Sequence, residues 1–197
     1  MRTHHVLHVT LEGTRVRLEP LEPRHEEPLW EAARGDERIF RWFPTVANES
    51  REAFHAWFEN VREQWLPFAQ VVGGVPLGST SYMNIREHDR VLEIGNTWLA
   101  PRAWNTGANA EAKYLLMEHA FEREGFHRVE FKTDEQNERA RAALAALPSQ
   151  FEGVFRKHMV VRGGQRRDSA WYAVIDDDWP EVKAALRERL AGKPAAG

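Results

Sequence analysis

The sequence predicts one domain of the mixed α/β class, built on a largely antiparallel sheet with helices beside it. Two patterns predict this class: short segments with strand-like alternation or continuous apolar character, and longer segments in which apolar residues recur every three or four positions. The two kinds of segment are interleaved along the chain, which is typical of a mixed domain. The length of 197 residues fits a single domain, and neither an internal repeat nor a linker divides residues 1–197.

The first predicted elements are a strand and two helices. Residues 14–19 alternate polar and apolar side chains and indicate a half-buried strand. Helical spacing of apolar residues predicts one helix over residues 24–34 and a second that begins at Ser50. The second helix carries an aromatic stripe on one face, which we assign to the core. This stripe consists of Phe54, Trp57, Phe58, Val61 and Trp65.

The loop between these two helices is a candidate for substrate contact. The chain has eight Trp residues, and an indole offers both an apolar ring and an N–H donor, which suits a ligand pocket. The loop holds two aromatic side chains next to each other, Trp42 and Phe43. We expect both to contact substrate.

Three apolar segments follow and predict an antiparallel meander of strands over residues 68–72, 75–85 and 91–99. Gly73 and Gly74 separate the first two segments. Two successive glycines favour a hairpin because both tolerate positive φ. A short polar stretch separates the second segment from the third.

The remaining elements alternate between helix and strand. The segment from residue 91 to residue 133 is expected to form a parallel, right-handed strand-helix-strand unit. A final helix is expected after the acidic residues 176–178. The predicted elements are a helix over 106–124, a strand over 128–133, a helix over 137–147, two strands within 151–175 joined by a turn at Gly163 and Gly164, and the final helix, which includes 182–190.

The composition excludes several classes of protein. The 27 Lys and Arg against 30 Asp and Glu give a net charge of −3, which argues against a nucleic-acid partner, and we expect the basic cluster at 162–167 to be an exposed hairpin tip. The chain has no cysteine, so disulfides, thiolate metal sites and a cysteine nucleophile are excluded. It has neither an apolar run of membrane-spanning length nor a signal-like start, so we expect no membrane partner and a cytoplasmic location.

Both ends of the chain are expected to be flexible. Residues 1–10 contain His4, His5 and His8. No carboxylate or further histidine lies at ligand spacing, so we expect a solvated arm and no metal there. Residues 191–197 are mostly small and are expected to form a flexible tail.

A candidate anion site lies where the strand ending at Leu99 leads into the next helix. Small residues around Gly107 let a ligand approach the backbone, and the N–H groups of the first helical turn lack helical partners. These groups and the positive end of the helix dipole suit a pyrophosphate. The alternative, which spacing alone leaves open, is that Asn105 and Thr106 only cap the helix.

Four motifs, together with the order of elements, resemble the GCN5-related N-acetyltransferases (GNAT), and among them the ribosomal-protein N-terminal acetyltransferases that act on alanine or serine. The motifs are LEIGNTWL at 92–99, WNTGAN at 104–109, NERA at 137–140 and FEGV at 151–154. The resemblance implies a mixed, mostly antiparallel sheet with a splayed parallel pair, flanked by helices. It also implies transfer of an acetyl group from acetyl-CoA to a primary amine, either a protein N-terminus or a small amine.

The resemblance further implies where acetyl-CoA would bind. The family's pyrophosphate motif falls on residues 104–109, where Gly107 alone matches. The strand Gly95–Leu99 would pair with the pantetheine arm, and Asn137 would touch the donor near its reactive end or cap the next helix. The implied cofactor-binding residues are Trp98, Leu99, Trp104, Asn105, Thr106, Gly107, Ala108, Asn109 and Asn137. Further candidates for phosphate contact, which could equally be solvated helix bases, are Lys113, Arg139 and Arg141.

Glu93 and His158 are the candidate catalytic residues. Two acid-base groups of the family are missing, because the position of its candidate acid, a serine, is Ala140 and its strand glutamate falls near Met159. Glu93 could act as a base through water or as a structural carboxylate. His158 has an ordinary pKa of ~6.5, suited to proton transfer, or is a plain strand histidine. Tyr172 is expected to bind the acceptor, with packing in the core as the alternative.

The missing cysteine implies that the amine attacks the thioester directly in a ternary complex. The replaced residues at Ala140 and Met159 keep open an alternative function: a catalytically weakened CoA-binding or protein-interaction module on the same fold. The sequence leaves the oligomeric state open between a monomer and a homodimer.

Overall fold

The structure is a computed structural model that describes residues 8–192. The predictions for His4, His5 and most of the C-terminal tail therefore lie outside the described residues. Within the described part of the expected arm, His8 Nε2 lies 2.6 Å from the carbonyl oxygen of Pro67, and the His8 ring packs edge-on against Phe68.

The described residues form an eight-stranded sheet in the order β1-β2-β3-β4-β5-β6-β8-β7. Its neighbouring strands are antiparallel except β5 and β6, which are parallel. The predicted mixed, mostly antiparallel sheet with one parallel pair is therefore confirmed. The strands are β1 (Leu11–Glu12), β2 (Arg17–Pro20), β3 (Leu66–Val72), β4 (Val75–Arg86), β5 (Val91–Leu99), β6 (Arg128–Asp134), β7 (Gln150–Val161) and β8 (Gln165–Ile175).

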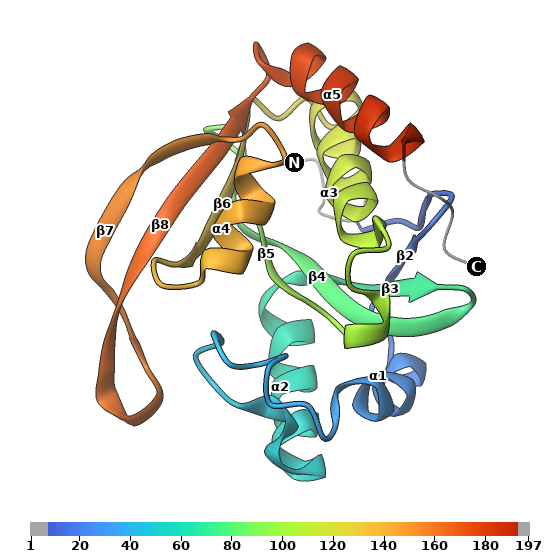
Figure 1. The fold of residues 1–197 in the computed structure, drawn as a ribbon, viewed down its shortest axis with the longest axis vertical. Coiled ribbons are helices and arrows are strands. Elements are labelled where there is room, and N and C mark those ends of the chain that lie inside the picture. Colours follow the sequence, from blue (N-terminus) through green and yellow to red (C-terminus); the bar gives the residue numbers. More distant parts are fainter. Residues whose placement is uncertain (1–7, 193–197) are drawn as a thin grey trace.

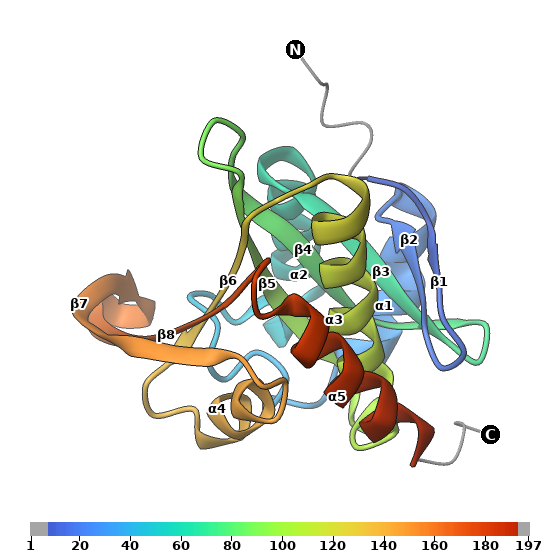
Figure 2. The ribbon, with the colours of Figure 1, turned by 90° about the horizontal axis from the view of Figure 1, so that it is seen from above.

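Helices flank both sides of the sheet. Figure 1 shows α3 and α5 above the β2–β5 half of the sheet, α1 and α2 below it, and α4 beside β6. Figure 2 shows the same layers from above, with the β7–β8 hairpin projecting to one side. The helices are α1 (Glu26–Ala33), α2 (Arg51–Gln64), α3 (Ala108–Glu118), α4 (Glu138–Ala145) and α5 (Trp179–Ala191).

Most boundaries agree with the predictions, with two differences. Ser50 caps α2 as predicted, since its Oγ accepts a hydrogen bond from the Ala53 N–H at 3.1 Å. The first difference is α3, which begins at Ala108 and not at Thr106, because Gly107 at its N-cap has a φ of 94°. The second is β1, a short strand that was not predicted.

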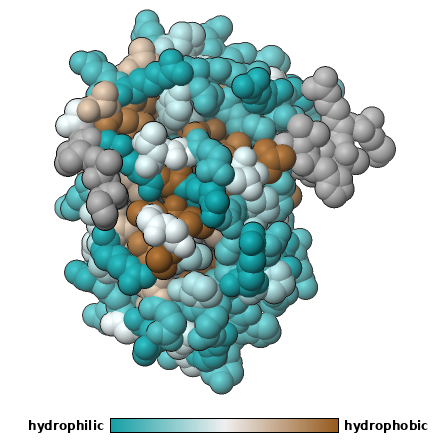
Figure 3. Space-filling view, turned by 90° about the vertical axis from the view of Figure 1, so that its right-hand side faces the viewer, coloured by the Kyte–Doolittle hydropathy of each residue, from teal (hydrophilic) through white to brown (hydrophobic). Residues whose placement is uncertain are grey.

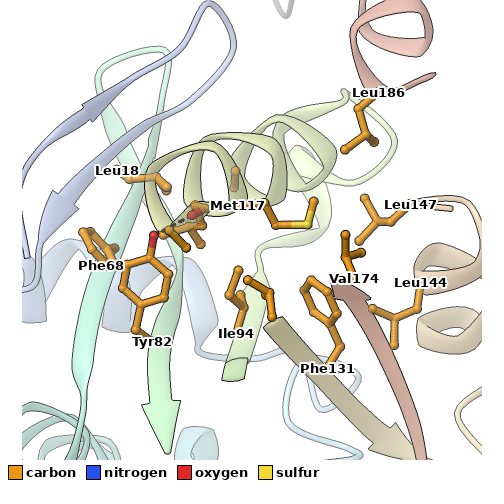
Figure 4. Packing of buried hydrophobic residues seen from close by; sticks show 14 of the residues in the cluster. Leu18, Phe68, Tyr82, Ile94, Met117, Phe131, Leu144, Leu147, Val174 and Leu186 are labelled. Carbon is orange, nitrogen blue, oxygen red and sulfur yellow. Dashed lines mark hydrogen bonds between the residues drawn. The ribbon is translucent and has the colours of Figure 1, made fainter. Parts of the chain in front are cut away.

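Two hydrophobic clusters lie on opposite sides of the sheet. The first joins the sheet to α3, α4 and α5 and includes Tyr82, Phe131 and Met117; Figure 4 shows the Tyr82 hydroxyl donating to the carbonyl of Leu116 at 2.6 Å. The second contains the aromatic stripe of α2. Figure 3 shows that apolar side chains still reach the surface at the centre of one face, within a hydrophilic border.

A bulge in β5 separates it from β6. Ser81 lies opposite Gly95 and Ser79 opposite Trp98, so β5 has one extra residue between these pairs, and Asn96 there has a φ of 48°. Parallel pairing with β6 ends at Glu93. The two strands then diverge (Figure 1), and the space between them forms the candidate site.

Glu111 on α3 ties the β1–β2 turn to the core. Its Oε2 accepts hydrogen bonds from the backbone N–H groups of Arg15 at 2.6 Å and Val16 at 2.9 Å, and its Oε1 accepts one from the Thr14 hydroxyl at 2.7 Å. We expect Glu111→Ala to lower the free energy of unfolding by about 2–3 kcal/mol, because two buried N–H groups lose their acceptor. Urea denaturation would measure this loss. Glu181→Ala, on the exposed side of α5, is the control and should change stability by less than about 0.5 kcal/mol.

Candidate active site

One cavity, here called the inner cavity, lies between the diverging strands β5 and β6. It has a volume of about 430 Å³. Apolar walls come from the α1–α2 loop, α4 and β7, and polar groups from the strands and α3. Its lining residues include Trp42, Phe43, Trp65, Met83, Glu93, Asn96, Thr97, Asn109, Lys113, Lys132, Asn137, Ala140, Met159 and Arg167.

A second cavity, here called the outer cavity, surrounds the start of α3 and has a volume of about 610 Å³. Thr97, Asn109 and Asn137 line both cavities, so the two are continuous. Among the described residues that line the outer cavity, none is Asp or Glu. Its basic residues are Arg38, Arg41, Arg139 and Arg189.

The start of α3 presents backbone N–H groups to the outer cavity. Gly107 and Asn105 both have positive φ, 94° and 64°, which produces a tight entry into the helix. Thr106 Oγ1 accepts from the Ala108 N–H at 3.2 Å, so Thr106 caps the first helical residue. The N–H groups of the next residues in the first turn have no helical partner. The expected anion site and the expected cap are therefore compatible.

Trp104 is a platform for two guanidinium groups at the mouth of the outer cavity. Arg139 Cζ lies 3.6 Å and Arg38 Cζ 4.9 Å from the centre of the Trp104 ring. Trp104 itself is fixed because its Nε1 donates to the carbonyl of Leu99 at 2.7 Å. Burial, and secondarily the charge of Arg38, lower the pKa of Arg139. An anion bound here would relieve this crowding of positive charge.

Glu93 is the acidic residue of the inner cavity. It is 1% exposed, and its Oε2 accepts hydrogen bonds from Lys132 Nζ and Asn84 Nδ2, both at 2.7 Å. Arg167 on β8 is 9% exposed; its Nη1 donates to the Trp42 carbonyl at 3.3 Å, and its Nε lies 3.7 Å from Asp134 Oδ2. The cavity therefore contains a carboxylate held in a fixed position by ionic and amide partners.

Several buried polar atoms around the inner cavity lack a hydrogen-bond partner. They include Asn96 Nδ2, Asn109 Oδ1 and Arg167 Nε. Buried polar groups are normally hydrogen-bonded. A donor (Asn96 Nδ2) and an acceptor (Asn109 Oδ1) without partners in the walls of one cavity indicate that a bound polar ligand supplies the missing hydrogen bonds.

His158 and Tyr172, two of the sequence-predicted site residues, line neither cavity. A register shift at Lys157, where φ is 52°, turns Met159 and not His158 toward the inner cavity. The His158 ring packs against Phe155 and Trp171, and burial lowers its pKa, with the charges of Lys132 and Arg167 as further causes.

Tyr172 belongs to the first hydrophobic cluster. It is 4% exposed, packs against Phe151, and accepts a hydrogen bond from Arg141 Nε at 3.2 Å. The expected acceptor contact is therefore corrected to its alternative, core packing. Arg141, bound to Tyr172 and to the carbonyl of Glu135, also lines neither cavity.

Other predicted residues differ in how they reach the site. Trp98 lines the outer cavity, while its indole, 4% exposed, packs in the second cluster against Phe40 and Trp57. Ala108 is buried in the first cluster, and Thr106 lines neither cavity. The residues placed at a cavity as predicted are Trp42, Phe43, Glu93, Trp98, Leu99, Trp104, Asn105, Gly107, Asn109 and Asn137.

Asn137 combines two predicted roles. Its Oδ1 accepts from the Ala140 N–H at 3.1 Å and caps α4, and the residue lines both cavities. Trp65, assigned to packing, packs against the second cluster and also lines the inner cavity.

Lys113, Lys132 and Arg167 are functional candidates that sequence reasoning missed or misplaced. Lys113 was expected at the phosphates but is buried at the inner cavity, and Arg167 was expected at an exposed hairpin tip. The available signal for Lys113 was its spacing from Leu116 and Met117, which places it on the apolar face of α3. For Arg167 the strand alternation of β8 was the only signal.

The described residues show neither a cluster of metal ligands nor a membrane-spanning helix. Among residues 8–192, no three His, Asp or Glu side chains lie close enough together to hold a metal ion. In the same range, no helix has both the length and the apolar character needed to cross a membrane.

Comparisons with known proteins identify the same family from sequence and from structure. A family model described as "Acetyltransferase (GNAT) domain" matches residues 15–147. A GCN5-related N-acetyltransferase from Brucella melitensis is 33% identical, with a TM-score of 0.88, over 94% of this chain and 86% of that one. No curated protein sequence matches the chain.

Two more distant structures share the fold. RimJ from Mycobacterium smegmatis, solved in complex with CoA-disulfide, is 22% identical, with a TM-score of 0.81, over 98% of this chain and 99% of that one. A ribosomal-protein-S5-alanine acetyltransferase from Vibrio fischeri is 20% identical, with a TM-score of 0.67, over 87% and 98%.

Proposed function

The chain belongs to the GNAT acetyltransferase family, and from this premise we propose that it transfers an acetyl group from acetyl-CoA to a primary amine by direct attack in a ternary complex. The observation that carries this proposal is the continuity of the two cavities across the gap between β5 and β6. One end is basic and contains a helix N-terminus, and the other contains a buried carboxylate. A donor with phosphates at one end and a thioester at the other fits this arrangement.

The residues present fit acetyl-CoA as the acyl donor. The phosphates would meet the first turn of α3 and the guanidinium groups on Trp104. The amide groups of a pantetheine arm would supply partners for Asn96 Nδ2 and Asn109 Oδ1, which lack them in the protein alone. Acetyl-CoA would supply the activated acyl group, and the protein would orient it.

Glu93 is the proposed acceptor of the amine proton. The attacking nitrogen forms a bond to the thioester carbonyl carbon and must lose one proton, and Glu93 is the carboxylate in the inner cavity. Its contacts with Lys132 and Asn84 use Oε2, which leaves Oε1 to receive the proton directly or through water.

The acceptor is proposed to enter past the α1–α2 loop, where Trp42 and Phe43 line both cavities. Arg167 donates to the backbone carbonyl of Trp42, and Arg162 at the tip of the β7–β8 hairpin contacts the backbone carbonyl of Arg41. The hairpin and the loop thus form one wall of the entrance. A protein N-terminus, as in the ribosomal-protein acetyltransferases that the sequence resembles, or a small amine is the proposed acceptor.

Calorimetric titration with acetyl-CoA and an assay of thiol release over a panel of amines would test this function. The panel should hold peptides with free N-terminal alanine or serine, their N-terminally blocked forms, and small amines. Binding of acetyl-CoA together with amine-dependent thiol release is expected. Failure to bind acetyl-CoA at millimolar concentration would contradict the proposal.

Arg139→Gln is expected to weaken acetyl-CoA binding about 5- to 10-fold, because it removes the guanidinium group nearest the Trp104 ring. Calorimetry at two salt concentrations would measure the change, which should shrink as salt increases. Arg141→Gln is the matched control, since Arg141 lies on the same helix but lines neither cavity. Acetyl-pantetheine, which lacks the nucleotide, should bind the Arg139 variant and the unmodified protein equally.

The alternative function, a CoA-binding or protein-interaction module with weakened catalysis, is favoured by one observation. Ala140 and Met159, which replace the family's acid-base groups, both line the inner cavity and contribute no polar atom there. This alternative predicts acetyl-CoA binding without thiol release on any amine, and a gain of activity in Ala140→Ser combined with Met159→Glu. Release from the unmodified protein would reject it.

A further inference from the structure

Helix α3 buries a lysine among its apolar residues. Lys113 is 5% exposed, and its Nζ donates to Thr97 Oγ1 at 2.5 Å and to Thr80 Oγ1 at 3.0 Å. Buried charges are normally paired with an opposite charge. Among the described residues, however, no carboxylate lies within ion-pair distance of this ammonium group. Two hydroxyl groups alone do not explain why a cation is kept here.

The other charged residues of the inner cavity are already compensated. Lys132 on β6 pairs with Glu93 on β5 at 2.7 Å, and Arg167 on β8 lies beside Asp134. Lys113 lacks such a partner, so burial lowers its pKa to about 7, although the charge of Glu93 acts in the opposite direction. Lys113 can therefore exist in either protonation state near neutral pH.

Lys113 also lies at the junction of the two cavities. Thr97, to which it donates, and Asn109, one turn earlier on α3, line both cavities, and Lys113 itself lines the inner one. An acyl donor held by its phosphates in the outer cavity would pass this junction to bring its thioester toward Glu93. Ala140 lines the same space and cannot supply a proton.

We propose that Lys113 is a catalytic residue that protonates the leaving thiolate, which extends the acetyl transfer proposed above. The amine nitrogen forms a bond to the carbonyl carbon, the carbon–sulfur bond breaks, and its electron pair remains on sulfur. The Lys113 ammonium gives one proton to this sulfur, and Glu93 receives one proton from the amine. Solvent then returns a proton to Lys113 and removes one from Glu93, so the net products are the amide and the thiol.

Proton transfer from the Lys113 ammonium group to the leaving thiolate is favourable. A free thiol has a pKa of ~8.5 and a solvated lysine ~10.4, so a solvated lysine would be the weaker acid of the pair. With a pKa of about 7, Lys113 is a stronger acid than the thiol that it would form. Desolvation of Lys113 thus produces an acid matched to a thiolate leaving group.

Two variants separate proton donation from charge alone. Lys113→Met keeps most of the length of the side chain and removes both the charge and the proton, whereas Lys113→Arg keeps the charge but does not release a proton. We expect both to lower kcat about 10- to 100-fold while the Kd for acetyl-CoA changes less than about threefold. Lys183→Met, on α5 and at neither cavity, is the control and should leave kcat unchanged. Near-normal kcat in Lys113→Arg would overturn the proposal.

The pH dependence gives a second test. Because Lys113 must be protonated to act, kcat of the unmodified enzyme should fall as pH rises above about 7, and this fall should be absent in Lys113→Met. Independently of activity, NMR of ¹³Cε-labelled lysine should show one signal that titrates near pH 7 and is missing from the spectrum of Lys113→Met. A spectrum without any lysine titrating below about pH 9 would overturn the proposal.

Mass spectrometry and the binding of acetyl-CoA distinguish failure of the Lys113 proposal from failure of the proposed function. Mass spectrometry after incubation with acetyl-CoA should find no acetyl group on Lys113, since an acetylated Lys113 would be a nucleophile and not a proton donor. If the unmodified protein binds no acetyl-CoA, the proposed function itself fails. Normal binding and turnover with an unaffected Lys113→Met variant would reject only the role of Lys113.

Discussion

Gly78→Ala is expected to lower the free energy of unfolding by about 4 kcal/mol or more, a large part of the total stability of an ordinary domain. Gly78 on β4 lies opposite Leu99 on β5. A Cβ atom at position 78 would lie 2.1 Å from the carbonyl oxygen of Trp98 and 2.9 Å from the Leu99 Cα. Both are backbone atoms of a neighbouring strand, so a rotamer change cannot relieve the overlap, and the two strands must separate.

The same displacement would break a buried hydrogen-bond network. The Trp98 carbonyl accepts from Gln70 Nε2 at 3.1 Å, and the same Nε2 donates to the Ser79 carbonyl at 3.0 Å. Gln70 is fully buried, so its lost partners would not be replaced by water. Thermal and urea denaturation would measure the loss. Gly192→Ala is the control, because its Cβ would meet its nearest neighbour at 3.8 Å, and an unchanged stability of Gly78→Ala would contradict this reading of β4 and β5.

The fold was predictable because its strands and helices have local signals. The double glycine at 73–74, the Ser50 cap and the apolar stripe of α2 each act within a few residues, and each has the predicted role in the structure. The parallel pairing of β5 with β6 also followed, since a strand-helix-strand unit leaves few other arrangements. The two-residue strand β1 lacks a pattern long enough to be recognised.

The site was less predictable because a bulge in β5 reverses the face of the sheet to which the side chains after it point. Uninterrupted alternation would put Ile94 and Trp98 on one face, whereas the extra residue at Asn96 sends Ile94 to the first cluster and Trp98 to the second. The same inversion turns Thr97 toward Lys113. The sequence reads as a continuous strand at this point, so it predicts neither the packing of the Trp98 indole in the second cluster nor the contact of Thr97 with Lys113.

Long-range packing explains the other misplaced residues. His158 and Met159 are adjacent in sequence, and the backbone turn at Lys157 decides which of them faces the inner cavity. Arg167 is buried because the β7–β8 hairpin folds against the α1–α2 loop, more than 120 residues earlier in the chain. Neither contact has a signal within a short window of sequence.

Glu93→Gln is expected to lower kcat about 100- to 1,000-fold, because it removes the carboxylate proposed to accept the amine proton. The Kd for acetyl-CoA should change less than about twofold, since Glu93 lies away from the basic outer cavity. Glu130→Gln is the matched control: Glu130 lies directly opposite Glu93 in the sheet and is also buried, but it pairs with Arg86 and Arg128 outside both cavities. Its kcat should stay within about threefold of the unmodified enzyme.

A double variant separates the chemical role of Glu93 from its structural role. Glu93→Gln leaves the Lys132 ammonium, 2.7 Å away, without its carboxylate partner, which should cost about 2–3 kcal/mol of stability. Adding Lys132→Met removes the unpaired charge, so most of the stability should return while kcat stays low. Recovery of both stability and kcat would show that Glu93 only holds the strands in place. Recovery of stability alone would assign the proton transfer to Glu93, because a folded cavity without this carboxylate would then bind acetyl-CoA but fail to deprotonate the amine.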